Sequence, residues 1–116
     1  MTEVECTIIA VEALEREVNN GGYKQFFGNT PEYAAEIVAA LQRIGCSHSS
    51  RIAEDAVNAL GLHDLSPEAV EEVACRDDDE VDAKLEECDL RFFEYQESIE
   101  TQLFRYIKTE KHRISF

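Results

Sequence analysis

The sequence predicts an all-α fold, a single domain covering residues 1–116 with about five or six helices and a long C-terminal helix. Apolar residues recur at steps of three and four along most of the chain, and this spacing places them on one side of a helix. Only 5 glycines and 2 prolines are present, too few for the many turns of an all-β domain. With 44% hydrophobic residues, the chain is apolar enough to bury one core.

The first predicted helix covers residues 3–18. Its apolar positions are Val4, Ile8, Val11, Leu14 and Val18. The segment Asn19-Asn20-Gly21-Gly22 is expected to end it, because glycine and asparagine tolerate the left-handed conformation at a helix C-terminus. Tyr23, Phe26 and Phe27 then fall on one face of a single helical turn, and we expect these aromatic side chains to fill the core.

Three further helices begin at recognisable capping residues. Thr30-Pro31-Glu32 provides a hydroxyl to cap and a proline for the first helical position, which predicts a second helix running to Ile44 before Gly45. A third helix is predicted from Ser49 or Ser50 to the residues before Gly61. Ser66-Pro67-Glu68 predicts the start of a short fourth helix.

The last predicted helix is long. The acidic run Asp77-Asp78-Asp79-Glu80 suits its N-terminus, where the helix dipole favours negative charge. Its apolar positions keep a 4-3-4-3 rhythm over about 26 residues, which predicts a helix of about 40 Å; they are Val81, Leu85, Cys88, Phe92, Tyr95, Ile99, Leu103 and Tyr106. Phe93, Phe104 and Ile107 lie off this stripe, so we expect another helix or a second subunit to cover them, the latter in a homodimer.

The charge of the chain excludes several classes of partner. It has 25 acidic and 11 basic residues and a formal net charge of −14, which repels the phosphates of nucleic acids and of anionic membranes. No apolar run approaches the ~20 residues that span a bilayer. The first residues are acidic where a secretory signal is basic, so we expect a cytoplasmic protein without direct nucleic-acid or membrane contacts.

No catalytic or cofactor site is predicted. The four cysteines are far apart in sequence, without a Cys-x-x-Cys pair or a zinc-ligand spacing, and are expected to be reduced thiols. His48 lies near Cys46 and two serines, but residues two apart do not face each other on a helix and no acid is adjacent to orient the imidazole. We therefore predict a protein that is not an enzyme.

A calcium site at Asp77-Asp78-Asp79 is also not expected. An EF-hand loop that began at Asp77 would require glycine at its sixth position and glutamate at its twelfth. Those positions hold Asp82 and Cys88. The sequence thus predicts no metal ligands.

The negative charge is concentrated in one segment. Residues 64–100 contain 15 acidic and 3 basic residues, and helical spacing brings their carboxylates to about 5–6 Å, comparable with successive phosphates on a strand. We predict a partner-binding acidic surface formed by Glu68, Glu71, Glu72, Asp77, Asp78, Asp79, Asp82, Glu86 and Asp89. The alternative is that these carboxylates only keep the protein in solution. Neutralising Asp78, Asp82, Glu86 and Asp89 is expected to leave the fold intact, because repulsion is relieved.

One segment resembles a known family. It reads Val18-Asn-Asn-Gly-Gly-Tyr-Lys-Gln-Phe-Phe-Gly-Asn29 and is followed by Tyr33-Ala34, Ala40-Leu41 and Ile44-Gly45-Cys46. This stretch is similar to the DNA mimic protein family, whose hallmark is an Asn-Gly-Gly-aromatic-x-Gln-Phe-Phe segment between two helices. The similarity covers roughly residues 11–60, and Tyr23 stands where phenylalanine is common. It implies an all-helical fold.

The resemblance also implies a function. A characterised branch of the family presents carboxylates in place of DNA phosphates and occupies the DNA-binding surface of a transcriptional regulator. We therefore expect an acidic protein-binding module whose partner is a basic DNA-binding protein or another cationic protein. An antitoxin- or immunity-like protein that neutralises a cationic effector would use the same complementarity. The motif residues are expected to be structural; they are Asn20, Gly21, Gly22, Tyr23, Gln25, Phe26, Phe27 and Asn29.

Overall fold

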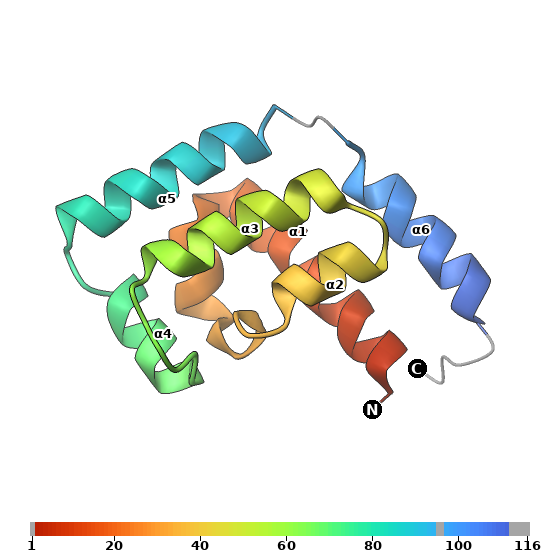
Figure 1. Ribbon diagram of the computed structural model, residues 1–116, viewed down its shortest axis with the longest axis horizontal. Helices are drawn as coiled ribbons and strands as arrows, with labels where there is room; N and C mark the ends of the chain where they lie inside the picture. Colours follow the sequence, from red (N-terminus) through yellow and green to blue (C-terminus); the bar gives the residue numbers. More distant parts are fainter. Residues whose placement is uncertain (1, 95–96, 112–116) are drawn as a thin grey trace.

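The helix α1 is the element against which most of the others pack (Figure 1). The computed structural model describes residues 2–94 and 97–111. Within them the helices are α1 (Glu3–Asn29), the short 3-10 helix η1 (Pro31–Tyr33), α2 (Ile37–Arg43), α3 (Ser47–Ala59), α4 (Pro67–Ala74), α5 (Asp79–Phe92) and α6 (Ile99–Glu110). The described residues form one globule without strands, which confirms the all-α prediction.

The N-terminus of α1 begins with a capping box. The Glu5 backbone N–H donates to Thr2 Oγ1 at 3.1 Å, and the Thr2 N–H donates to Glu5 Oε1 at 2.9 Å. These bonds satisfy two donors that a helix N-terminus otherwise leaves free. The predicted apolar stripe of this helix is buried throughout, at Val4, Ile8, Val11, Leu14 and Val18.

The predicted end of the first helix is a kink rather than an end. Gly22 has a φ of 81°, in the left-handed region that favours glycine, and with Gly21 it interrupts the helical backbone. The chain then resumes a helix to Asn29, so that α1 has two arms. Periodicity and turn residues located the interruption correctly, but they did not show that the following aromatic turn extends into a second helical arm.

The predicted second helix, residues 31–44, is wrong in its first half. Only residues 37–43 are α-helical, and Pro31–Tyr33 form a 3-10 turn. Thr30 does not cap this segment, because its hydroxyl donates to the Phe26 carbonyl at 2.6 Å and so completes the end of α1. No side chain caps the new turn, and its backbone bonds, from Tyr33 N–H to the Thr30 carbonyl and from Ala34 N–H to the Pro31 carbonyl, follow the tighter i→i+3 pattern. Gly45, with a φ of 89°, follows the end of α2 as expected.

Two other predicted boundaries agree closely with the structure. The helix α3 begins at Ser47, two residues before the predicted start, and ends just before Gly61, whose φ is 67°. The Ala69 N–H donates to Ser66 Oγ at 3.3 Å, so Ser66 caps α4 as predicted. Local capping chemistry was sufficient for the end of α3 and the start of α4, whereas no side chain caps the start of α3.

The prediction of one long C-terminal helix is wrong. The segment forms two helices, α5 and α6, and the longest helix in the described residues is α1. Figure 1 shows α5 and α6 meeting at an angle. Ser98 caps α6 by accepting the Thr101 N–H at 3.2 Å, and Glu97 accepts the Ser49 N–H of α3 at 2.6 Å. These contacts fix the chain in a non-helical conformation before α6. Tyr95, part of the predicted stripe, lies outside the described residues.

The aromatic residues after the kink form the centre of the core. Tyr23, Phe26 and Phe27 are fully buried, and the ring of Tyr23 meets that of Phe92 on α5 edge to face, with centroids 6.2 Å apart. This geometry is favourable for aromatic pairs. The second arm of α1, residues 23–29, is therefore attached to α5 through the core.

Replacing Phe26 with alanine should lower the free energy of unfolding by about 3–5 kcal/mol, because it leaves a cavity in a close-packed core. Phe104 provides a matched control, since the same substitution there removes a ring that is 61% exposed and should change stability by less than about 1 kcal/mol. Urea denaturation followed by circular dichroism measures both. Equal losses in the two variants would show that the aromatic cluster is not the centre of the core.

Candidate protein-binding surface

Five predicted surface carboxylates are exposed. They lie on α4, on α5 and on the connection between them, at the left in Figure 1. Among the described residues their side chains form no ion pair or hydrogen bond. We call this set the α4–α5 acidic surface: Glu68, Glu71, Asp77, Asp79 and Glu86.

Two of the other predicted carboxylates have local partners. Glu72 pairs with Arg76 one turn later at 3.1 Å, and both side chains remain largely exposed, so the pair contributes little to stability. Asp78 is the N-cap of α5 and accepts the N–H groups of Glu80 and Val81 at 3.1 and 3.2 Å. Asp78 therefore has a structural role as well as a charge.

The remaining two, Asp82 and Asp89, contact α1. The Lys24 ammonium lies 2.9 Å from Asp82 Oδ1. The Tyr23 backbone N–H, at the kink, donates to Asp89 Oδ1 at 2.8 Å. Burial raises the pKa of Asp89, while this backbone bond acts in the opposite direction. A side chain at Gly22 would collide with the Asp89 carboxylate, so the kink and Asp89 fit each other closely.

These contacts change what we expect from neutralising the acidic segment. Of the four carboxylates Asp78, Asp82, Glu86 and Asp89, only Glu86 lacks an internal partner among residues 2–94 and 97–111. Removing the other three charges is now expected to weaken the fold, contrary to the sequence-based expectation. Sequence reasoning missed the roles of Asp82 and Asp89 because their partners, Lys24 and Tyr23, are distant in the chain.

The polar residues of the family motif bind an internal carboxylate. Asn29 Nδ2 and Gln25 Nε2 donate to Glu17 Oε1 at 2.9 and 3.1 Å, and Arg16 Nε donates to Glu17 Oε2 at 2.9 Å. These bonds, led by that from Asn29, lower the pKa of Glu17 to about 2. They join the two arms of α1 across the kink. Asn20, by contrast, is exposed.

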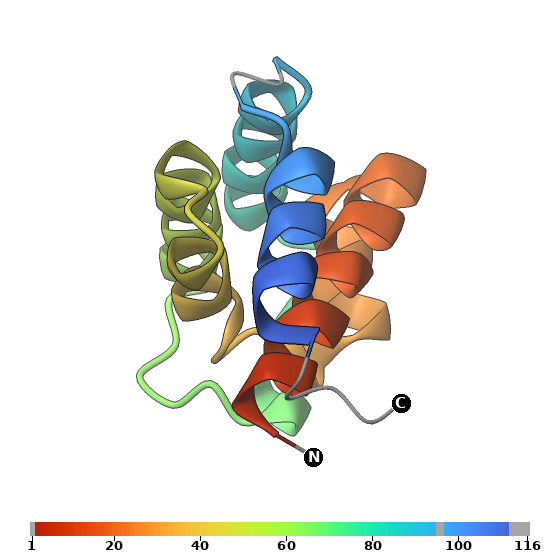
Figure 2. The ribbon, with the colours of Figure 1, turned by 90° about the vertical axis from the view of Figure 1, so that its right-hand side faces the viewer.

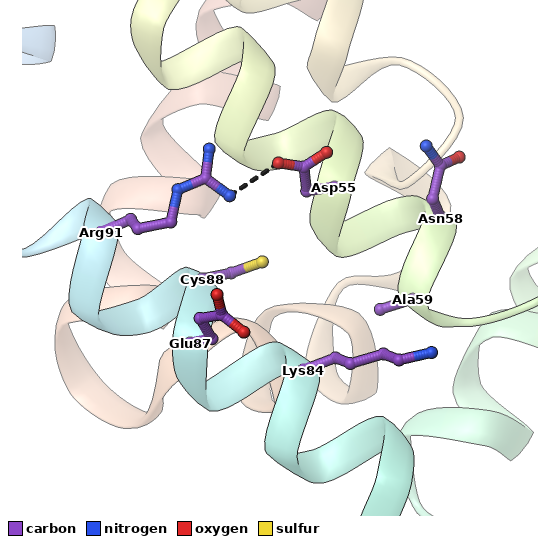
Figure 3. Close-up of a pocket in the computed structure, with 7 residues that line it drawn as sticks. All are labelled: Asp55, Asn58, Ala59, Lys84, Glu87, Cys88 and Arg91. Carbon is purple, nitrogen blue, oxygen red and sulfur yellow. Dashed lines mark hydrogen bonds and ion pairs between the residues drawn. The ribbon is translucent and has the colours of Figure 1, made fainter.

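A groove between α3 and α5 lies beside the acidic surface (Figure 3). Its volume is about 310 Å³. The Arg91 guanidinium bridges it to Asp55 at 2.6 Å, and Lys84 lies on the same wall as Glu87. Since these charges balance one another, the groove does not continue the negative surface.

The nucleophile candidates are buried. Burial raises the pKa of the Cys46 thiol to about 12 and that of Cys88 to about 11, so both are protonated at neutral pH and unreactive. His48 Nε2 is buried and has no hydrogen-bond partner in the described part of the chain. No three His, Cys, Asp or Glu side chains in that part are grouped to hold a metal ion. No helix within it is long and apolar enough to span a membrane.

The fold and this surface define a small, acidic, all-helical protein with a set of exposed carboxylates on α4, on α5 and between them. The chain belongs to the family described as DMP19-like protein, which it matches over residues 1–110. The match therefore extends beyond the motif into α4, α5 and α6. No curated protein and no solved structure gives a significant match.

Replacing Glu17 with glutamine tests whether the hydrogen bonds that Glu17 accepts from Gln25 and Asn29, across the kink, stabilise the fold. Because the folded-state pKa of Glu17 is about 2, below the ordinary 4.5, the unfolded chain takes up the proton first as the pH falls. Glu17 thus stabilises the fold at neutral pH, and this contribution is lost between about pH 5 and pH 2. Glu17→Gln should be less stable than the wild type at neutral pH, and the difference should shrink as the pH falls.

Urea denaturation at about pH 7, 5 and 3 measures this difference. The exposed Glu54 provides the control, since Glu54→Gln should differ little from the wild type at each pH. A destabilisation by Glu17→Gln that stays constant with pH would contradict this stabilising role of the Glu17 carboxylate.

Proposed function

We propose that this chain is an acidic protein-binding module that acts as a DNA mimic. In this proposal the α4–α5 acidic surface occupies the DNA-binding surface of a basic DNA-binding protein or transcriptional regulator. The observation that carries it is the set of five exposed carboxylates that have no internal partner in the described residues. Family membership is in keeping with it.

The spacing of these carboxylates supports the comparison with DNA. Glu68 and Glu71 lie one turn apart on α4, and Asp79 and Glu86 lie two turns apart on α5. Side chains one turn apart on a helix are about 5–6 Å from each other. Like charges at this spacing weaken a helix slightly. Binding of a cationic ligand would explain why these carboxylates accumulate without internal ion pairs.

The distribution of charge favours an oriented approach. Arg105 and Lys108 are exposed on α6, at the opposite end of the molecule from α4 (Figure 1), so they do not neutralise the acidic surface. A partner rich in lysine and arginine is attracted to the exposed carboxylates of the α4–α5 acidic surface. The same cationic side chains bind DNA phosphates, so the two ligands compete.

The test uses a triple variant with Glu71→Gln, Asp77→Asn and Glu86→Gln. These residues form no ion pair or hydrogen bond in the described chain, so the melting temperature should change little. A control with Glu32→Gln, Glu36→Gln and Glu54→Gln changes the net charge equally at exposed positions elsewhere. Each protein is immobilised and exposed to the fraction of a native cell extract that binds DNA-cellulose.

Wild type and control should retain the same DNA-binding protein, and duplex DNA or added salt should release it. The triple variant should retain at least about tenfold less, since three charge contacts are lost. Equal retention by all three proteins, or retention that duplex DNA does not reduce, would contradict mimicry. The carboxylates would then only keep the protein in solution.

We also propose that the chain forms a homodimer. The long helix on which the sequence-based expectation rested is divided, but Leu90 on α5 is 69% exposed and Phe93 follows it one turn later with 42% exposed. Burying such a pair between two copies is favourable.

Light scattering at micromolar concentration should therefore report about twice the chain mass of 13.2 kDa. Leu90→Glu should give the single-chain mass, because a charge would be buried in the interface. A single-chain mass for the wild type would end this proposal.

A further inference from the structure

A groove of about 460 Å³ lies between α1 and α6, which run side by side in Figure 2. Its lining comprises Glu12, Glu15, Arg16 and Asn19 from α1 and Glu100 and Leu103 from α6. Apolar atoms make up most of this lining, which also includes the three glutamates. The groove is formed by different helices from the α4–α5 acidic surface.

The carboxylates at this groove lack a cation. Arg16, the basic residue of the lining, is bound to Glu17 at 2.9 Å. Glu12, Glu15 and Glu100 form no ion pair within residues 2–94 and 97–111. Glu15 is half-buried; burial and the nearby Glu100 raise its pKa, while a hydrogen bond with the Asn19 side chain acts in the opposite direction. A cation bound between Glu15 and Glu100 would offset the repulsion between them.

The apolar surface continues beyond the groove. Phe104 lies one turn after Glu100 on the same side of α6 and is 61% exposed. Lys108 Nζ is 5.3 Å from the centroid of its ring. The ring of Phe104 therefore already has a cation beside it, whereas the groove with its apolar lining and three glutamates matches a ligand that combines apolar surface with positive charge. A hydrated inorganic cation would leave the apolar part unused.

We propose that the α1–α6 groove binds an arginine side chain of a partner protein, with its alkyl stem against Leu103 and its guanidinium between Glu15 and Glu100. The guanidinium is weakly hydrated and planar, and its several donors can serve two carboxylates at once. Its three-carbon stem suits the apolar lining. This inference goes beyond the proposed mimicry and does not depend on it, because it concerns a separate surface.

The test uses n-butylguanidinium as the probe, with guanidinium and n-butanol as its charged and apolar parts. Binding to the full ¹⁵N-labelled chain is followed through amide chemical shifts. The butylguanidinium ion should shift the resonances of Glu15, Asn19, Glu100 and Leu103 saturably. Each part alone should bind more weakly, because the groove offers both kinds of contact. Guanidinium or butanol binding as tightly as the whole probe would overturn the proposal.

A pair of variants supplies the second measurement. Glu15→Gln should weaken n-butylguanidinium binding by about threefold or more, while the melting temperature stays the same or rises as the repulsion by Glu100 is removed. Glu54→Gln, an exposed change of equal charge on α3, should leave the affinity unchanged. Equal affinity of Glu15→Gln and wild type would overturn the proposal. Shifts of the groove resonances on raising the protein concentration alone would assign the groove to a second copy of the chain, which also overturns it.

Discussion

The kink of α1 at Gly21 and Gly22 is the constraint on which the rest of the structure depends. The left-handed backbone at Gly22 frees the next backbone donor, and Asp89 of α5 accepts it from Tyr23 at 2.8 Å. Without the kink, the arm carrying Tyr23, Phe26 and Phe27 would point away from α5. A buried backbone N–H without a partner would be unfavourable. One contact thus sets the direction of the arm and the position of α5 together.

This arrangement divides the acidic residues into two groups with different roles. Asp82 and Asp89 face α1 and hold α5 on the core, and Asp78 begins that helix. Glu71 and Glu86 project from the solvent side. The helix α5 bears carboxylates around much of its circumference, so those facing α1 hold it on the core while the others remain in solvent. The fold stabilises itself with some of the charges and leaves the others exposed.

Sequence reasoning succeeded where the determining chemistry was local. Ser66 and Gly61 act within one turn of their own helices, so their neighbours were enough to place them. The separation of α5 from α6 was missed because both helices bury their residues in the same core, and a continuous apolar stripe does not reveal a break. Its cause, the contact of Glu97 with the Ser49 N–H, spans 48 residues. The contact of Asp89 with the kink spans 66. Residue spacing carries no information on such pairs.

The two surfaces differ in how far their charges act. The molecule is 44 Å long, whereas the screening length at physiological ionic strength is about 8 Å. Charges at the α4 end are therefore felt mainly by a partner that approaches that end, where several exposed carboxylates add to one another. In the α1–α6 groove fewer carboxylates act, Glu15 is half-buried, and a short-range contact with a half-buried charge is screened less by salt. Salt should therefore weaken binding at the α4–α5 acidic surface more than binding in the groove. The ionic-strength dependence of each interaction, measured separately, then distinguishes long-range attraction to the α4–α5 acidic surface from a short-range contact in the α1–α6 groove.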